Sequence, residues 1–262
     1  MKNRIWELDF FRGFAIMMMI FDHLMYDFMI LPSLFGNYSQ VNNEVFNWLK
    51  DQGSLYWHSD LRFFGHFFFL AVFLLISGIS FNFSKNNLQR GLKLLIVALL
   101  ITVVTLVAEI LTGSGFLIVF GIIHMFALAI IITYFIRKFI KNELVILVIG
   151  LIILGAGFVF KFYDMTFQSS FFWKDLPEII IGTKAFGADH FGLIPYTGIL
   201  LIGTVIGKTF YQNRLSLWPK VNLSSKNFFI FLGQKSLIIF VAHQIVLLAL
   251  VYLIGYIFGY RI

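Results

Sequence analysis

Seven long apolar stretches divide the sequence, and they constrain the fold more than any other feature. Each approaches or exceeds the roughly 20 residues with which a helix crosses the hydrocarbon core of a bilayer. The stretches run Phe10–Leu31, Phe63–Phe83, Leu92–Leu111, Phe116–Phe135, Leu144–Phe162, Leu193–Phe210 and Leu237–Phe258. They are continuous rather than alternating apolar and polar, which favours helices over a membrane β-barrel. The sequence therefore predicts an all-α, polytopic membrane bundle of about seven helices.

The composition excludes the soluble classes of protein. Of 262 residues, 60% are hydrophobic and only 13% are charged, whereas an average soluble domain carries about 25% charged residues. A soluble enzyme and a disordered chain are both incompatible with these values. The chain has no Cys, which excludes a disulfide, a thiolate metal site and a cysteinyl acyl-enzyme. Any chemistry must use His, Asp, Glu, Ser, Tyr or Arg.

The net charge of +7 reflects orientation in the membrane rather than binding to nucleic acid, because the cations gather in loops on one side. With the N-terminus inside, thirteen of the 20 Lys and Arg residues fall in inner segments: Lys2, Arg4, Lys85, Arg90, Lys93, Arg137, Lys138, Lys141, Lys208, Arg214, Lys220, Lys226 and Lys235. Six fall in outer segments: Lys50, Arg62, Lys161, Lys174, Lys184 and Arg261. Arg12 lies near the inner end of the first stretch. The positive-inside rule then predicts N-in and C-out.

The first stretch is expected to be retained as a helix, since it is longer than a signal peptide and contains Asp22 and His23. A retained first helix and short basic loops are typical of a bacterial inner membrane. Between the stretches, Asn43–Lys50 reads as a short amphipathic piece, and Leu232–Ser236 as a flexible polar lead-in to the last stretch. We find no repeat or linker, so residues 1–262 are expected to form a single domain.

The first stretch and its lead-in carry the most polar residues at membrane depth, where ionisable groups are costly and each one suggests function. Asp9, Arg12, His23 and Asp27 follow at spacings of three, eleven and four. Eleven residues return to within about 20° on a helix, so the four form one stripe that is expected to face the bundle interior. The rise from Arg12 to His23 is about 16 Å. One helix thus offers a cation near the inner surface and a base in the outer half.

Two interpretations of this stripe stay open. His23 and Asp27 lie four residues apart and can hydrogen-bond, and a carboxylate that fixes a histidine tautomer supports a general base. Arg12 would then act as an anion-binding group near the inner surface. Alternatively, Asp9 and Arg12 form only an i,i+3 salt bridge at the helix entrance, and His23 caps a neighbouring carbonyl.

Other polar residues are expected in the same outer half. His58 and Asp60 precede the second stretch, His124 lies within the fourth, and Asp189 precedes the sixth. We predict His58 as a second candidate base, and Asp60, His124 and Asp189 as candidate substrate-binding groups.

His243 in the last stretch either lines an inner binding cavity or bonds a carbonyl of a neighbouring helix. No pair of the H-E-x-x-H kind occurs, so no metal is predicted.

The order of the motifs resembles a known group of enzymes. The segment Glu7–Ile16, followed by Phe21–Leu24, resembles the opening of the membrane acyltransferase superfamily. Its hallmark is Arg or Lys, ten residues and then His, which Arg12 and His23 match. Further segments look most like the small bacterial branch grouped with the catalytic domain of heparan-α-glucosaminide N-acetyltransferase: Phe73–Ser80, Asp189–Gly203 and Leu232–Gln244. The resemblance covers nearly the whole chain.

The resemblance implies transfer of an acyl group, with acetyl expected, from cytosolic acetyl-CoA to a hydroxyl or amine of an extracytoplasmic saccharide or glycolipid. In the sugar N-acetyltransferase, an Asn occupies the position of His23, and the catalytic His lies in the following lumenal loop. The nearest counterpart here is His58, with an offset of one residue. His23 and His58 therefore both stay candidates for the base. The expected partners are acyl-CoA, the acceptor and the lipid bilayer, without nucleic acid, and the sequence leaves homo-oligomer formation open.

Two other classes of function compete with this one. A small proton-coupled transporter would use the His and Asp stripe as a relay, but such carriers more often show two related halves, and the sequence shows no internal symmetry. A catalytically silent membrane scaffold would suit the short chain.

Overall fold

The chain folds into helices, as predicted, with one short strand pair in the part that the structure describes. The computed structural model describes residues 4–113, 115–162, 166–221, 223 and 227–262. The residues divide into two compact units, Met1–Phe73 with Leu215–Ile262, and Leu74–Arg214. We refer to these as unit 1 and unit 2.

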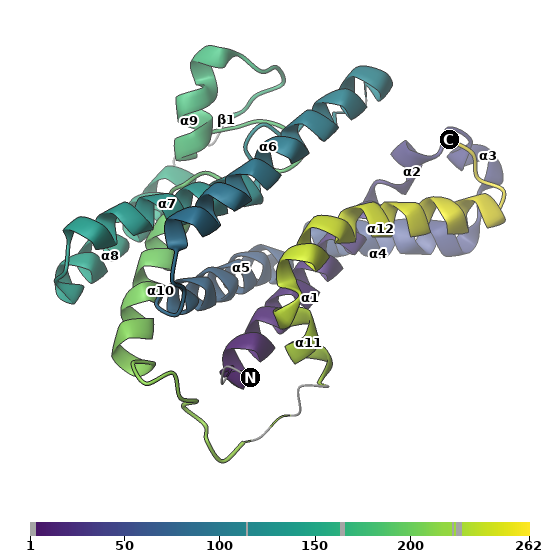
Figure 1. The fold of residues 1–262 in the computed structure, drawn as a ribbon. Coiled ribbons are helices and arrows are strands. Elements are labelled where there is room, and N and C mark those ends of the chain that lie inside the picture. The colour runs from purple at the N-terminus through teal and green to yellow at the C-terminus, as the bar shows by residue number, and fades with distance from the viewer. Residues whose placement is uncertain (1–3, 114, 163–165, 222, 224–226) are drawn as a thin grey trace. The chain divides into compact units, whose positions relative to one another are not determined.

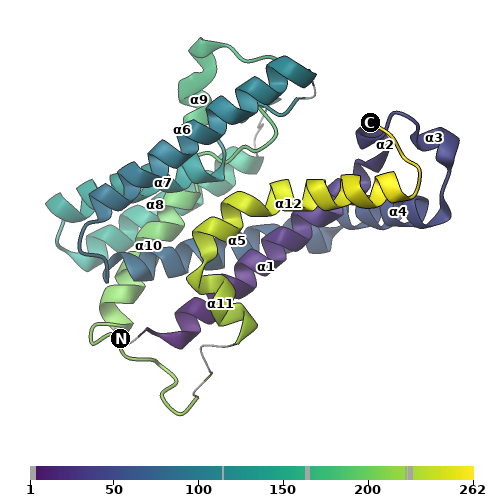
Figure 2. The same cartoon turned by 45° about the vertical axis from the view of Figure 1, so that its right-hand side comes forward.

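Unit 1 is built around its first helix. Its helices are α1 (Trp6–Met29), α2 (Leu31–Leu34), α3 (Tyr38–Val41), α4 (Glu44–Trp57), the first part of α5 (Asp60–Phe81), α11 (Phe228–Gln234) and α12 (Ser236–Ile257). Helix α1 contacts α4, α11 and α12. Figures 1 and 2 show α11 crossing the beginning of α1, drawn in purple, and α12 following its later half.

Glycines allow α1 and α11 to pack backbone against backbone. A Cβ added at Gly13 would overlap the carbonyl oxygen of Phe229, and one added at Gly233 would overlap that of Asp9. Small residues at such contacts are typical of helices that pack closely in membranes. The expectation of a flexible Leu232–Ser236 is wrong for its first half, because α11 extends through Gln234 and Gly233 is needed for this contact.

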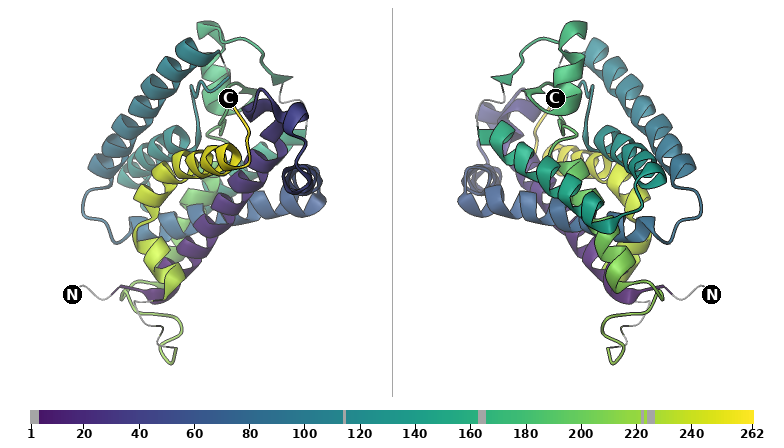
Figure 3. Two further views of the ribbon diagram at one scale, coloured as in Figure 1. Left: turned by 90° about the vertical axis from the view of Figure 1, so that its right-hand side faces the viewer. Right: turned by 90° about the vertical axis from the view of Figure 1, so that its left-hand side faces the viewer.

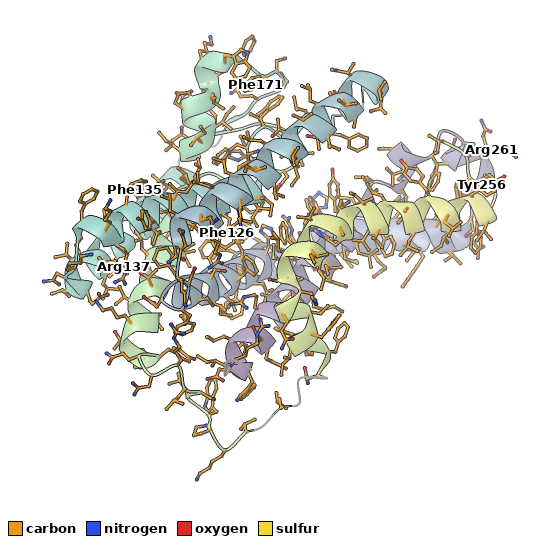
Figure 4. The ribbon with its side chains drawn as sticks, in the orientation of Figure 1. Phe126, Phe135, Arg137, Phe171, Tyr256 and Arg261 are labelled. Carbon is orange, nitrogen blue, oxygen red and sulfur yellow. The ribbon has the colours of Figure 1, made fainter. Side chains whose placement is uncertain are left out.

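An aromatic cluster closes the other end of unit 1. Phe35, Phe46 and Tyr260 are buried against one another, with ring centroids 4.5 Å apart for Phe46 and Tyr260. The chain end returns to this cluster, where the backbone N–H of Gly36 donates to the carbonyl oxygen of Arg261 at 2.8 Å. Figure 3 shows the C-terminus beside α2 and α3, and Figure 4 labels Arg261 there. The cluster fixes the last residues after α12 to the segment that follows α1.

Unit 2 contains the end of α5 and the middle of the chain. Its further elements are α6 (Asn87–Thr112), α7 (Ile122–Phe139), α8 (Glu143–Phe162), β1 (Thr166–Phe167), η1 (Trp173–Asp175), α9 (Leu176–Ile181), β2 (Lys184–Ala185) and α10 (Tyr196–Phe210). The two strands pair in parallel. Helices α5 and α10 approach so closely that a Cβ on Gly78 would overlap the carbonyl oxygen of Leu200.

An ion-pair network joins the ends of three helices in unit 2. Arg137 of α7 donates to Glu143 Oε1 at 2.8 Å and, through Nε, to Thr204 Oγ1 at 2.9 Å (Figure 4). Lys208 of α10 donates to the same carboxylate oxygen at 2.7 Å. The guanidinium therefore links α7 to both α8 and α10.

The helices support an integral membrane protein. Within the described residues, four are long and apolar enough to cross a bilayer, namely α5, α6, α7 and α12. In α6 and α12 most apolar side chains are exposed, as at Leu111 (78%) and Ile245 (70%). Such an exposed apolar surface is unfavourable in water and favourable in lipid. Helix α1 has 24 residues but carries Glu7, Asp9, Arg12, Asp22 and Asp27. Each predicted stretch coincides with a helix, while the count of seven spanning helices stays a prediction.

The largest difference from the predicted boundaries is at the start of α7. Helix α7 begins at Ile122 rather than at Phe116, because side chains of α6 satisfy the backbone before it. The backbone N–H of Phe116 donates to Glu109 Oε2 at 2.7 Å, and that of Ile118 donates to Thr105 Oγ1 at 3.1 Å. The apolar run continues, but its backbone has polar partners that a helix would replace.

Candidate active site

The first turns of α1 hold a compact group of charges. Asp9 is buried and forms ion pairs with Arg12, at 3.0 Å, and with Arg4, also at 3.0 Å. The side chain of Arg12 is 14% exposed. The predicted salt bridge between Asp9 and Arg12 is therefore confirmed. It does not test whether Arg12 also binds an anion, so that role stays a prediction.

The later half of α1 meets α12 at a pair of histidines. The rings of His23 and His243 lie 4.7 Å apart between centroids, edge to face. His23 Nδ1 is 2.9 Å from the carbonyl oxygen of Met19, and His243 Nδ1 is 2.7 Å from that of Phe240. Because a carbonyl only accepts, Nδ1 carries the proton in each neutral ring, and Nε2 is the basic nitrogen.

One helical turn further along, α1 and α12 share a second polar contact. Gln244 Nε2 donates to Asp27 Oδ1 at 2.8 Å, and Asp27 is fully buried. Of the two interpretations left open for His23, the hydrogen bond to Asp27 is wrong, and the bond to a neighbouring carbonyl is confirmed. His23 Nδ1 bonds its own helix instead, and Asp27 Oδ2 has no hydrogen-bond partner among the described residues. Asp27 is thus held by α12 rather than by the histidine on its own helix.

These four residues, His23, Asp27, His243 and Gln244, form a group that we call the histidine cluster. Three of its buried polar atoms have no hydrogen-bond partner in the described part of the chain: Asp27 Oδ2, His243 Nε2 and Gln244 Oε1. Buried polar groups are nearly always hydrogen-bonded. These three atoms are therefore available to form hydrogen bonds with a polar molecule that binds at the cluster.

His58 and Asp60 lie at the corner between α4 and α5 and are exposed. His58 is the C-cap of α4, and its Nδ1 lies 2.8 Å from the carbonyl oxygen of Ser54. By the same reasoning as above, its basic nitrogen is Nε2. Asp60 is the first residue of α5. Both histidines predicted as bases therefore belong to unit 1, together with Arg12 and His243.

A contact that sequence reasoning missed links this corner to α1. Asp22 accepts from Arg62 Nε at 3.0 Å and from Tyr56 Oη at 3.1 Å. Burial, with the Asp22 carboxylate adding to it, raises the pKa of Tyr56 to about 12, so the phenol stays protonated and donates. The adjacency of Asp22 to His23 was the available signal, but nothing in the sequence indicated its partner.

His124 and Asp189 belong to unit 2 and lie around the start of α7. His124 is buried, with Nε2 2.9 Å from Thr102 Oγ1. Asp189 Oδ2 accepts from the backbone N–H of Ile122 at 3.0 Å, as a cap of α7. Both side chains therefore have local structural contacts. Their predicted role in substrate binding is not tested by these contacts and stays a prediction, as does that of Asp60.

Comparison with known families identifies the chain. The model of the heparan-alpha-glucosaminide N-acetyltransferase catalytic family matches residues 4–245. The chain belongs to this family. A comparison with curated proteins and one with solved structures give no significant match.

Family membership confirms the resemblance drawn from the motifs and makes the chain a membrane acetyltransferase. The match contains the charged turns of α1, the corner with His58, and the whole histidine cluster. Within the described residues, no group of three or more His, Asp and Glu side chains could hold a metal ion.

Proposed function

We propose that this membrane acetyltransferase moves an acetyl group from cytosolic acetyl-CoA to a hydroxyl or amine of an extracytoplasmic saccharide or glycolipid, with His23 as the general base. The observation that carries the proposal is the histidine cluster on the helix that bears Arg12. It combines a basic imidazole nitrogen, a buried carboxylate and unpartnered polar atoms in the family's catalytic region.

His23 would act through Nε2, since its Nδ1 bonds the helix backbone. As the acceptor oxygen or nitrogen attacks the thioester carbonyl, its proton passes to Nε2 and a new bond to the acetyl carbon forms. The C–S bond then breaks, and the imidazolium returns the proton to the leaving thiolate, which departs as CoA thiol. The buried Asp27, held by Gln244, favours the imidazolium electrostatically from one turn away.

Arg12, with Arg4 beside it on Asp9, would bind the phosphates of the donor. A pantetheine arm along α1 would span the rise of about 16 Å between Arg12 and His23. His243, whose ring touches that of His23, would contact the thioester end of the donor. This path agrees with the predicted orientation, with the N-terminus inside a bacterial plasma membrane.

The test is thioester turnover by the purified protein in nanodiscs, with acetyl-CoA as donor and glucosamine or glucose as the amine or hydroxyl acceptor. Released CoA is measured with a thiol reagent, and the absence of Cys from the chain removes the background signal. We expect His23→Ala to lower kcat by about 10²- to 10⁴-fold, the usual contribution of a general base. His190→Ala, a histidine of unit 2 bonded to the carbonyl oxygen of Ile179, is the matched control and should keep the wild-type rate.

Arg12→Ala should raise the KM for acetyl-CoA. Loss of activity in His58→Ala with wild-type activity in His23→Ala would move the base to the α4–α5 corner. Absence of turnover by the wild-type protein with either acceptor would contradict the proposal.

A further inference from the structure

The buried carboxylate of Asp22 gathers three hydrogen bonds from the α4–α5 corner. Besides the bonds from Arg62 Nε and Tyr56 Oη, Arg62 Nη2 donates to Asp22 Oδ2 at 3.3 Å. The guanidinium also lies over the ring of Trp57, 3.7 Å from its centroid. The side chain of Asp22 is 8% exposed and that of Arg62 is 22% exposed. We call Asp22, Tyr56 and Arg62 the α1 clamp.

The two donors of the clamp stand on either side of His58 in the chain. Between them, Ser59 orders the turn, because its Oγ donates to the carbonyl oxygen of Tyr56 at 2.7 Å and accepts from the backbone N–H of Arg62 at 3.2 Å. His58 is itself bonded to the last turn of α4. Tyr56 and Arg62 therefore attach the corner, with its histidine, to α1.

The attachment point is the residue before His23. Successive residues of a helix point about 100° apart, so one turn of α1 holds the clamp on one face and presents His23 to α12 on another. A buried ion pair adds little net stability, because desolvation offsets much of the attraction, but its geometry is well defined. The two hydrogen bonds from the Arg62 guanidinium further restrict the geometry of this ion pair.

We propose that the α1 clamp positions the α4–α5 corner, and with it the acceptor side of the site, against the turn of α1 that carries His23. Asp22, Tyr56 and Arg62 are then positioning residues, which act through the two histidines rather than on the substrates. The expected effect on kcat rests on the proposed function. The expected effect on the distance between α1 and α4 rests on the geometry of unit 1 alone.

The experiment compares Asp22→Asn, Tyr56→Phe and Arg62→Lys with the wild-type protein in nanodiscs. Lys50→Gln is the matched control, since it breaks an ion pair with Asp51 on the same helix, α4, away from the clamp. Spin labels on introduced cysteines at Met17 of α1 and Leu55 of α4, both exposed, report the distance between the two helices. The same proteins without labels are assayed for kcat and for the KM of acetyl-CoA, per monodisperse protein.

We expect Asp22→Asn to broaden the distance distribution and to lower kcat on the order of tenfold to a hundredfold, with the KM for the donor within about twofold, as for misplaced reacting groups. Arg62→Lys keeps the positive charge but loses the bidentate donation of the guanidinium, so its kcat should lie between those of Asp22→Asn and the wild type. Tyr56→Phe, which removes one hydroxyl, should cause a smaller loss of kcat in a well-folded protein. Lys50→Gln should match the wild type in both measurements.

A wild-type kcat and distance distribution in both Asp22→Asn and Tyr56→Phe would overturn the inference, as would a change confined to the KM. If the wild-type protein releases no CoA thiol, the proposed function fails, but a broadened distribution in Asp22→Asn beside an unchanged Lys50→Gln still supports the clamp.

Discussion

At the residue scale, three histidines of unit 1 share one arrangement. His23, His58 and His243 each direct Nδ1 to a carbonyl oxygen three or four residues earlier in the chain. This bond fixes the tautomer and the orientation of each ring without a carboxylate partner. A general base in this site therefore depends on the backbone of its own helix for its tautomer, and on neighbouring helices for its surroundings.

A residue-scale prediction concerns Glu143, just before the apolar stretch of α8. Burial by itself would raise the pKa of this carboxyl, but the hydrogen bonds from Arg137 and Lys208 outweigh burial and hold the pKa below its usual value of 4.5. The ionised form therefore stabilises unit 2 fully above pH 4.5, and this contribution disappears as the pH falls through the lowered pKa. Glu143→Gln should lower the unfolding free energy by about 1 kcal/mol or less at pH 7, since the carboxylate is partly exposed.

The measurement is thermal unfolding of the two proteins in detergent at pH 7 and at about pH 4, followed by tryptophan fluorescence. The difference between wild type and Glu143→Gln should shrink at the lower pH. A difference that is the same at both pH values would show that the carboxylate charge is not its cause.

The residues of the site could be selected from the sequence, but most of their contacts could not. Intramembrane charges are rare, so Arg12, His23 and Asp27 stood out, and the helical period placed them on one stripe. The partner of Asp27 is Gln244, 217 positions away, and no local pattern encodes such a contact. The same holds for Asp22 and Arg62, whose pairing depends on how α4 turns into α5.

At the element scale, the first turns of α1 depend on close approach to α11. Gly13 follows Arg12 in the motif that identified the family, and its lack of a side chain lets the α11 backbone contact α1. Any side chain at Gly13 or Gly233 would separate the two helices and change the position of the charges around Asp9.

The corresponding prediction compares two glycine-to-alanine substitutions. Gly13→Ala should lower the unfolding free energy by about 1–3 kcal/mol, the usual cost of overpacking. Gly155→Ala is the matched control, since an added Cβ there meets nothing within 4 Å, and alanine favours a helix by up to about 1 kcal/mol over glycine. Thermal unfolding in detergent should show opposite signs, and a Gly13→Ala protein as stable as Gly155→Ala would contradict the packing.

The long helices could largely be predicted from the sequence, because the thickness of the hydrocarbon core of a bilayer sets the length of an apolar run that spans it. The seven stretches correspond to α1, α5, α6, α7, α8, α10 and α12. The short helix α11 was not predicted, since seven residues hold too little periodic signal and Gly233 suggests flexibility. The apolar run predicts the start of α7 six residues too early, because apolar composition does not indicate which backbone groups are hydrogen-bonded to side chains instead of within a helix.

At the scale of the whole molecule, transfer from a cytosolic donor to an extracytoplasmic acceptor requires a chain that exposes different segments to the two sides of a membrane. The predicted orientation places the inner loop before Glu143 in the cytoplasm and the segment 163–190 outside. Both assignments rest on the distribution of Lys and Arg. They decide which side supplies the donor and which the acceptor.

The absence of native Cys makes this orientation directly measurable. In intact bacterial cells that express single-cysteine variants, a membrane-impermeant maleimide should label Ser170→Cys. It should label Lys141→Cys only after the cells are permeabilised. Both positions are exposed in the structure, so burial within the protein would not prevent labelling. Labelling of Lys141→Cys but not Ser170→Cys in intact cells would reverse the orientation and, with it, the proposed direction of transfer.

The central claim is that His23 of α1 is the base of a membrane acetyltransferase, and release of CoA by His23→Ala and His58→Ala tests it most directly. The account predicts that wild-type protein releases CoA in the presence of an acceptor, that His23→Ala loses about 10²- to 10⁴-fold in kcat, and that His58→Ala retains a larger share of the activity. Wild-type turnover by His23→Ala together with an inactive His58→Ala would contradict it.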